Sequence, residues 1–378
     1  MARKPSPFRS PRRTALDALD AAQRIAFGPV VFQVVRALRE LGVLASLERA
    51  SRRGATLGRL AEETGVPRSS IAVLVESALT VDVVCQRAAD GEDERYALTK
   101  IGWLLLHDPM TRANVDFVHD VCFRALYHLE EASRSERPAG LAEIGPGATV
   151  YEALATLPPK VRASWLAFDH FYSDSAFEAA ARIVAGSAPA RLLDVGANTG
   201  KFALRCLATM PRARLTLVDL PGQLAMARRA LGEAATAGAE PPLARVELVP
   251  LDVLDRHARF PGPVDAVWMS QFLECFAEDD VVSILRRARA ALATGGAVWI
   301  LGSYWDRQAS PLAAFCIANT SPYFTAVATG TSRMYRFSDV ERLAACAGLR
   351  VADSVDGLGI AHTLVRLVPH EPARASSP

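Results

Sequence analysis

Three acidic residues stand at the ends of three short apolar runs. Asp194 follows "RLL", Asp219 ends "LTLVD", and Asp252 follows "VELVPL". If these runs are neighbouring strands of a parallel sheet, their carboxyl ends meet at one edge, where ligands bind in such sheets. Carboxylates there can face a cation and accept hydrogen bonds from hydroxyl or amine groups. One such acid is often a turn or helix cap, whereas three in succession predict a ligand site.

The turn after the first run carries two glycines. Gly196 and Gly200 would let the backbone turn tightly and approach a ligand closely. The spacing Asp-x-Gly-x-x-x-Gly departs from the G-x-G-x-x-G fingerprint of dinucleotide sites, because residue 198 is not glycine. The acid also precedes the glycines, where it can face a positive charge. The pattern therefore favours S-adenosylmethionine, whose ammonium and sulfonium groups are cationic, over a pyrophosphate.

The other two acids suit the remaining parts of that nucleoside. Asp219 offers two carboxylate oxygens, and we expect it to accept hydrogen bonds from both ribose hydroxyls. Asp252 is predicted to accept a hydrogen bond from the exocyclic amine of adenine, with Val253 and Leu254 packing on the ring. The three acids together would then recognise the whole nucleoside.

The elements that must position these residues begin at about residue 187. Short apolar runs such as "RLTLVDL" and "GAVWILGSY" alternate with helical segments such as "GKFALRCLATM" and "EDDVVSILRRARAAL". This alternation predicts βαβ units and a parallel sheet buried on both faces. The last segment, from "RFSDVERL" onwards, predicts one helix and an antiparallel pair of strands. Residues 187–368 are therefore expected to form an α/β, Rossmann-like, doubly wound and mostly parallel sheet with an antiparallel end.

Two helical blocks come before that domain. In residues 16–110 a short helix ends at Gly65, Pro67 marks a turn, and a second apolar helix follows. The stretch "RYALTKIGWLL" then indicates a wing of β-strand leading into another helix. We therefore predict an α-helical winged-helix domain here. Residues 111–186 are predicted to be a helical linker beside the acceptor pocket, with a new helix starting at Pro158 and Pro159.

A winged helix can read DNA, which would make this chain a regulator. A recognition helix needs Arg, Lys, Asn or Gln facing base edges and phosphates. The candidate helix "SSIAVLVESALTVDVV" has none of these residues. The loop of the wing carries acids that would repel a duplex, namely Asp90, Glu92, Asp93 and Glu94. We therefore expect no nucleic-acid partner.

Composition limits the remaining possibilities. The chain has 378 residues and a formal net charge of +2, so no strong field draws it to nucleic acid or to an anionic membrane. No uncharged apolar run approaches the ~20 residues that span a bilayer. Residues 1–15 and 369–378 are predicted to be disordered tails without a secretory signal. The six cysteines show no metal-ligand spacing and suggest a reducing compartment, so we expect a cytoplasmic protein without a bound metal or membrane partner.

Residues from roughly 20 to 368 resemble a class I S-adenosylmethionine-dependent methyltransferase of the small-molecule O-methyltransferase family. The resemblance is carried by "LLDVGANTG", "VDLP", "DAVWMSQFLECFAEDDVVSILRRARAAL", "ALATGGAVWIL" and "RFSDVERLAACAGLR". It implies a homodimer formed through the N-terminal domain, with a middle segment that closes over a small acceptor. The predicted cofactor contacts are Asp194, Gly196, Asn198, Gly200, Asp219, Leu220, Asp252, Val253, Ser270 and Gln271.

The chain departs from this family at the catalytic base. The family has a histidine in a stretch resembling "LHDW", whereas this chain has "LECF", which puts Glu274 at that position. Gly302 and Ser332 stand where the family has the acids that orient the histidine. Three hypotheses follow. Glu274 is the base for a hydroxyl, with a pKa raised by burial; it holds a phenol or takes a ring proton during methylation of carbon; or it only binds the acceptor.

Aromatic residues are predicted to line the acceptor pocket. His170, in "FDHFYSD", lies on the helix that lines this pocket in the family and is a second catalytic candidate, although such a histidine is more often a packing residue. Asp169 and Asp306 are interpreted as solvated or capping residues, and His362 as structural. The predicted acceptor contacts are Phe168, Phe171, Tyr172, Tyr304 and Tyr323.

The acceptor class follows from a second resemblance. The segment "ANTSPYFTAVATGTSRMY" is similar to methyltransferases that accompany aryl-polyene pigment pathways, which favours a phenolic acceptor and a role in secondary metabolism. We therefore predict methyl transfer to a small phenolic or aromatic acceptor, with O-methylation preferred. The alternatives are C-methylation of an aromatic ring, and a divergent member that binds the cofactor without methylating anything.

Overall fold

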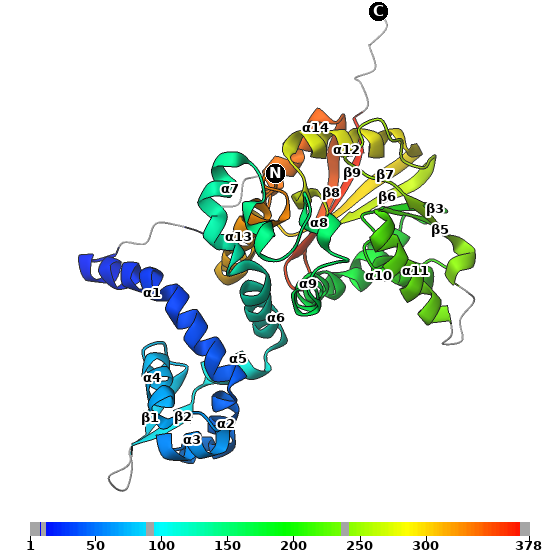
Figure 1. Ribbon diagram of the computed structural model, residues 1–378. Helices are drawn as coiled ribbons and strands as arrows, with labels where there is room; N and C mark the ends of the chain where they lie inside the picture. Colours follow the sequence, from blue (N-terminus) through cyan, green and yellow to red (C-terminus); the bar gives the residue numbers. More distant parts are fainter. Residues whose placement is uncertain (1–7, 9–12, 88–93, 236–241, 371–378) are drawn as a thin grey trace, which may run out of the picture. The chain divides into compact units, whose positions relative to one another are not determined.

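The computed structural model describes residues 8, 13–87, 94–235 and 242–370 (Figure 1). It divides into two compact units, one of Arg9–Val118 and one of His119–Pro378 together with Met1–Phe8. The first unit thus continues past the predicted boundary at residue 110. Most of the two predicted tails lies outside the described residues, as do the wing acids Asp90, Glu92 and Asp93.

The N-terminal unit is helical with a two-stranded wing. Its elements are α1 (Ala15–Glu40), α2 (Val43–Ala50), α3 (Leu57–Thr64), α4 (Arg68–Leu79), β1 (Val84–Arg87), β2 (Arg95–Leu98), α5 (Lys100–His107) and α6 (Pro109–Phe117). Gly65 ends α3 with a φ of +71°, a left-handed conformation that glycine adopts without strain. The strands β1 and β2 pair antiparallel. The predicted winged-helix arrangement is confirmed.

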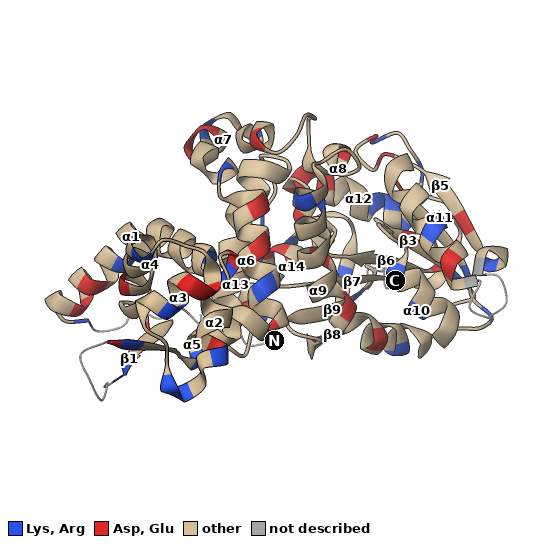
Figure 2. Ribbon diagram, turned by 60° about the horizontal axis from the view of Figure 1, so that its bottom comes forward, with Lys and Arg blue, Asp and Glu red and all other residues tan. Residues whose placement is uncertain are grey.

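The core of this unit holds the apolar stripes of its helices. Leu38, Leu44, Leu47, Leu60 and Ile71 have no exposed surface, as expected for amphipathic helices that pack around one centre. The helix α4 begins with Arg68, one residue before the stretch considered for DNA reading, and its other charged residue is Glu76. Figure 2 shows acidic and basic residues interspersed over the helices rather than gathered on α4.

The second unit opens with a run of short turns and helices. It contains a π turn (Val118–Cys122), a 3-10 turn (Ala125–His128), α7 (Leu129–Ser135), a second 3-10 turn (Ala139–Glu143), α8 (Val150–Ala153) and the long helix α9 (Pro159–Ala185). Proline suits the first turn of a helix because the missing N–H has no partner there, and α9 begins at Pro159 as predicted.

A seven-stranded sheet forms the centre of the second unit (Figure 1), in the order β5-β4-β3-β6-β7-β9-β8. The strands are β3 (Arg191–Val195), β4 (Arg214–Asp219), β5 (Val246–Pro250), β6 (Val264–Ser270), β7 (Leu292–Gly302), β8 (Leu349–Leu358) and β9 (His362–Pro369). All pairings are parallel except those of β9, which is antiparallel to both neighbours. The predicted fold class, including its antiparallel end, is confirmed.

Helices cover both faces of this sheet. They are α10 (Lys201–Thr209), α11 (Pro221–Ala235), α12 (Glu278–Ala290), α13 (Pro311–Tyr323) and α14 (Phe337–Cys346), besides α9. On one face α9, α10 and α11 share a core with Leu192 and Trp268, whose ring stacks on Phe202 at 3.7 Å. On the other, α12 and α14 pack against β7 and β8. Continuous apolar strands are what burial on both faces requires.

None of the helices in the described part of the chain has the length and apolar character of a membrane span.

Candidate active site

The predicted cofactor residues gather where the strand order reverses between β3 and β6. β3 continues through turn 196–200 into α10, while β4 ends at Asp219 and β6 at Ser270. Gly196 and Gly200 have φ of +78° and +73°, in the left-handed region that favours glycine. A Cβ on Gly196 would also lie 2.2 Å from the ring of Phe272. Both geometry and space therefore call for glycine at residue 196.

Asp194 in β3 is a buried acid, and one of its carboxylate oxygens lacks a hydrogen-bond partner among the described residues. Its side chain is 2% exposed, and the oxygen concerned is Oδ2. Burial and the charge of Asp219 raise its pKa to about 8. A buried carboxylate is costly unless a cation or a hydrogen-bond donor meets it. Asn198 Oδ1 and Ser270 Oγ also lack a described partner, so these oxygens fit a ligand that brings positive charge and donors, as S-adenosylmethionine does.

Asp219 is held at the end of β4 by two backbone donors. Its Oδ2 accepts from the N–H of Asn198 at 2.8 Å, and its Oδ1 accepts from the N–H of Leu220 at 2.7 Å. Burial raises its pKa to about 6, against the effect of these hydrogen bonds. Each carboxylate oxygen has a second lone pair. The carboxylate is thus fixed in direction and still able to accept a pair of hydroxyl groups.

Asp252 occupies a different environment from the other two acids. It is exposed, and its Oδ1 accepts from the N–H of Leu254 at 2.8 Å, which is a local turn contact. The carbonyl of the adjacent Val253 accepts a hydrogen bond from Arg287, and Leu254 is 43% exposed. The structure thus shows Asp252 shaping the turn after β5, the edge strand, and its contact with adenine stays a prediction.

The interpretation of Asp169 as a solvated or capping residue is wrong. This acid of α9 is half-buried, and its carboxylate accepts from Asn198 Nδ2 at 3.0 Å and from Gln271 Nε2 at 3.1 Å. Burial raises its pKa to about 7. The sequence holds a signal for this position, since Trp165, Asp169, Ser173 and Phe177 recur every four residues, and the other three are buried. By contrast, Asp306 caps α14 by accepting from the N–H of Phe337 at 2.9 Å.

Glu274 lies in the turn Leu273–Cys275 directly after β6. The residue is half-buried, and burial together with the charge of Asp169 raises the pKa of its carboxyl to about 7. Burial and then the charge of Glu274 raise the pKa of Tyr304, so the phenol and the carboxyl are close enough to influence one another. A carboxyl that titrates near neutral pH can take a proton from an acceptor.

His170 contacts the glycine turn. Its Nε2 lies 3.2 Å from Thr199 Oγ1, and burial followed by the charge of Lys201 lowers its pKa. The structure therefore links His170 to the cofactor turn, and its catalytic role remains a hypothesis.

The predicted acceptor aromatics fall into two groups. Phe168, Phe171 and Tyr172 are half-buried on α9, with the Tyr172 ring 5.0 Å from that of Phe168 and 5.5 Å from that of Phe171. Tyr304 and Tyr323 are instead 4% and 5% exposed. The hydroxyl of Tyr323 also accepts a hydrogen bond from Trp165 Nε1 at 2.6 Å. The α9 group therefore offers more surface to an acceptor than the two tyrosines do.

Tyr304 lies against Gly302, one of the two positions where the resemblance predicts that a family acid is replaced. A Cβ added to Gly302 would lie 2.7 Å from the Tyr304 hydroxyl oxygen and 2.9 Å from the ring carbon that carries it. The tyrosine therefore fills the space into which a longer residue at 302 would extend. Ser332, the second replaced position, is buried and hydrogen-bonded to Thr329. Neither position carries a carboxylate that could orient a base.

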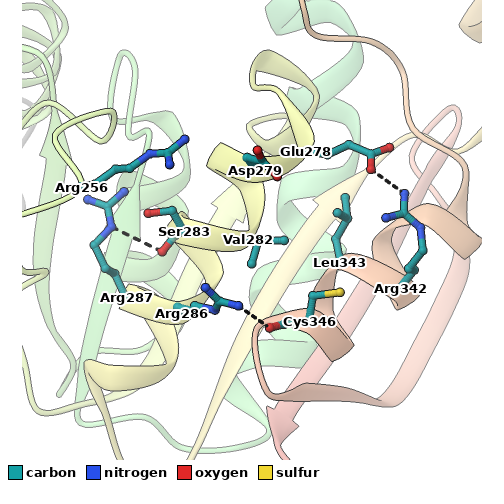
Figure 3. A pocket seen from close by; sticks show the side chains of 10 residues that line it. All are labelled: Arg256, Glu278, Asp279, Val282, Ser283, Arg286, Arg287, Arg342, Leu343 and Cys346. Carbon is teal, nitrogen blue, oxygen red and sulfur yellow. Dashed lines mark hydrogen bonds and ion pairs between the residues drawn. The ribbon is translucent and has the colours of Figure 1, made fainter.

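A separate pocket of about 580 Å³ lies between α12 and α14 (Figure 3). None of the predicted site residues lines it, and its arginines already make hydrogen bonds within the protein. Arg286 donates to the Cys346 carbonyl at 3.1 Å and Arg342 to Glu278 at 2.8 Å, while Arg287 donates to backbone carbonyls. Because these guanidinium groups are already hydrogen-bonded, we assign no ligand to this pocket.

Comparisons with known proteins agree with this layout. Residues 20–96 match the family described as Dimerisation2-like domain, and residues 193–298 match the family described as Methyltransferase domain. The L-tyrosine C(3)-methyltransferase of Streptomyces lavendulae is 25% identical over 86% of this chain and 85% of its own length. The demethylspheroidene O-methyltransferase of Cereibacter sphaeroides is 28% identical over 72% of this chain and 68% of its own.

Another relative carries a different activity in its name. The aclacinomycin 10-hydroxylase RdmB of Streptomyces purpurascens is 28% identical over 70% of this chain and 68% of its own. Among solved structures, the S-adenosylmethionine-dependent methyltransferase SibL superposes with a TM-score of 0.67 at 23% identity, covering 93% of this chain and all of that one. The chain therefore carries a dimerisation-type domain followed by a methyltransferase domain, and its fold is that of an S-adenosylmethionine-dependent methyltransferase.

Proposed function

We propose that this protein transfers a methyl group from S-adenosylmethionine to the hydroxyl of a small phenolic acceptor, leaving S-adenosylhomocysteine. The observation that carries the proposal is the buried Asp194, whose Oδ2 has no described partner beside a turn that requires glycine. A cationic nucleoside supplies what that carboxyl lacks. The matched methyltransferase domain, residues 193–298, contains this site.

The cofactor would lie across the ends of β3, β4 and β6. Asp194, Asn198 and Ser270 offer oxygen atoms without described partners, and Asp219 offers the second lone pairs of a fixed carboxylate. When bound, S-adenosylmethionine supplies an electrophilic methyl group on a positively charged sulfur. The protein must bring the acceptor oxygen in line with that methyl group and remove its proton.

Glu274 is the residue that we propose for proton removal. Its pKa of about 7 places a useful fraction of the carboxylate at neutral pH, and makes it a stronger base than an ordinary glutamate. As the acceptor oxygen forms its new bond to carbon, the hydroxyl proton moves to the Glu274 carboxylate. The rings of Phe168, Phe171 and Tyr172 on α9 provide an apolar surface for the acceptor. His170 is the alternative base.

Two other outcomes have specific support. The L-tyrosine C(3)-methyltransferase among the relatives favours methylation of a ring carbon, with Glu274 taking the ring proton instead. The hydroxylase among the relatives favours a member that binds the cofactor and performs another reaction.

Product analysis separates these possibilities. The purified protein is incubated with S-adenosylmethionine and a panel of phenols that includes tyrosine, and the products are examined by mass spectrometry. We expect a gain of one methyl group that fragmentation assigns to oxygen. A methyl group on a ring carbon would replace our proposal by the C-methyl alternative. Bound cofactor without any methylated product would support the non-methylating alternative, and no binding of S-adenosylhomocysteine in calorimetry would refute the cofactor assignment itself.

We also propose a cytoplasmic homodimer joined through the N-terminal unit. Residues 20–96 match a dimerisation domain, and α1 presents the exposed apolar side chains of Leu16, Leu19, Ile25, Phe27 and Val30. Apolar side chains gathered on one exposed helix mark an interaction surface. The six free cysteines are compatible with a reducing compartment.

A further inference from the structure

Two residues in the segments that follow β3 and β6 have an unusual backbone conformation. Asn198 and Gln271 have φ of +48° and +47°, although neither is glycine. Asparagine enters the left-handed region with modest cost, while glutamine does so less readily. Such conformations persist where the surrounding structure holds them. Both residues belong to the predicted cofactor set, so what holds them also shapes that site.

One carboxylate on a third element holds both side chains. Asp169 Oδ2 accepts from the amide of Asn198 at 3.0 Å, and Asp169 Oδ1 accepts from the amide of Gln271 at 3.1 Å. His362, which is fully buried, lies with its Nε2 2.7 Å from Gln271 Oε1 and thereby fixes which way that amide points. Hydrogen bonds to a charged acceptor in a protein interior are among the stronger ones.

Further contacts tie the same helix to the same turn. His170 Nε2 lies 3.2 Å from Thr199 Oγ1, and Asp174 pairs with Lys201 at 2.5 Å. The backbone N–H of Asn198 donates to Asp219, and Asn198 Oδ1 has no described partner. The side-chain nitrogen of Asn198 is therefore hydrogen-bonded to Asp169, and its side-chain oxygen is available to a ligand.

We propose that Asp169 is a positioning residue that holds turn 196–200 and the end of β6 in the shape that receives the cofactor. Because α9 also carries the aromatic surface proposed for the acceptor, the same carboxylate couples the acceptor helix to cofactor affinity. This inference rests on the cofactor assignment made above. It gives Asp169 a task in binding that is separate from proton transfer at Glu274.

An amide at residue 169 cannot accept the hydrogen bonds of both Asn198 and Gln271. In Asp169→Asn, the new side chain has one acceptor oxygen for two donor amides, and its own NH2 group faces the second donor. Gln271 cannot turn its amide around without losing its contact with His362. We expect the Kd for S-adenosylhomocysteine, measured by isothermal titration calorimetry, to weaken about 10-fold or more.

A compensating variant tests whether hydrogen bonding is the cause. Adding Asn198→Asp to Asp169→Asn reverses donor and acceptor across this contact and leaves the Gln271 bond in place. We expect the double variant to regain part of the lost affinity and to bind S-adenosylhomocysteine at least about 3-fold more tightly than Asp169→Asn alone. The control is Glu178→Gln, the same change on an exposed residue of α9 that pairs with Arg182, and its Kd should not change.

Hydrogen–deuterium exchange measured without ligand gives a second readout. In Asp169→Asn, peptides covering residues 194–201 and 268–275 should exchange faster, while the rest of the sheet is unchanged. An unaltered Kd with unaltered exchange in both segments would overturn the inference, as would a double variant no better than the single one. If wild-type protein fails to bind S-adenosylhomocysteine, the proposed function fails, and the exchange experiment still decides whether Asp169 holds the two segments.

Discussion

At the scale of single residues, the site is dominated by acids with unusual protonation behaviour. Burial raises the pKa of Asp194, Asp169 and Glu274 into the range from about 7 to about 8. The charge of Asp219 acts on Asp194 and the charge of Asp169 acts on Glu274, and bound positive charge would relieve both repulsions. A site lined by buried acids is therefore suited to a ligand that carries positive charge.

Glu274 should give the reaction a pH dependence. Because the base must be deprotonated, kcat/KM is expected to rise with pH through about 7 and to level off above it. Glu274→Gln should lower kcat at least ~10²-fold and remove this rising limb, with the Kd for S-adenosylhomocysteine unchanged. Turnover near the wild-type rate in that variant would exclude Glu274 as the base.

Replacing Asp194 should raise the stability of the ligand-free protein and weaken cofactor binding. Its folded-state pKa of about 8 lies above the usual 3.8, so its contribution to the free energy of unfolding is present at low pH and lost as pH rises from about 4 through about 8. Asp194→Asn should therefore raise the Tm of the ligand-free protein more at pH 9 than at pH 6, and weaken cofactor binding. A Tm difference that is equal at both pH values would contradict this assignment.

At the scale of elements, the turn between β3 and α10 sets the geometry of the site. Gly196→Ala should abolish cofactor binding, because a Cβ there meets the Phe272 ring and the φ of +78° is strained for alanine. Gly232→Ala is a matched control, since Gly232 lies within α11 with nothing within 4 Å of its added Cβ. That change should stabilise the helix by about 0.5–1 kcal/mol. Calorimetry and thermal unfolding of both variants test the contrast.

The elements were predictable from the sequence because each carries its own periodicity. Continuous apolar runs gave the parallel strands, and Pro159 and Gly65 gave helix boundaries, since each reflects a local property of the chain. Asp169 could not be placed in this way. Its partners Asn198 and Gln271 come from distant segments, so its burial depends on tertiary packing. Asp252 likewise ends an apolar run like its neighbours, but the exposed turn beyond β5 engages it locally.

At the scale of the whole molecule, the exposed apolar face of α1 predicts association. We expect sedimentation velocity to show a dimer, and the double change Phe27→Glu and Val30→Glu, on one side of α1, to shift it toward monomer, because buried charge opposes an apolar interface. Leu312→Glu is the control, since Leu312 is 62% exposed in the other unit. A wild-type monomer, or a variant that stays dimeric, would contradict the proposed interface.

The position of Tyr304 restricts how this protein can be converted into a histidine-dependent relative. Glu274→His alone would lack an orienting acid, and Gly302→Asp would drive its new carbon into the Tyr304 hydroxyl. Replacing Tyr304 by a smaller residue first would open the space for the acid. A redesign that begins at residue 302 would instead have to displace the Tyr304 hydroxyl, so the order of the two steps matters.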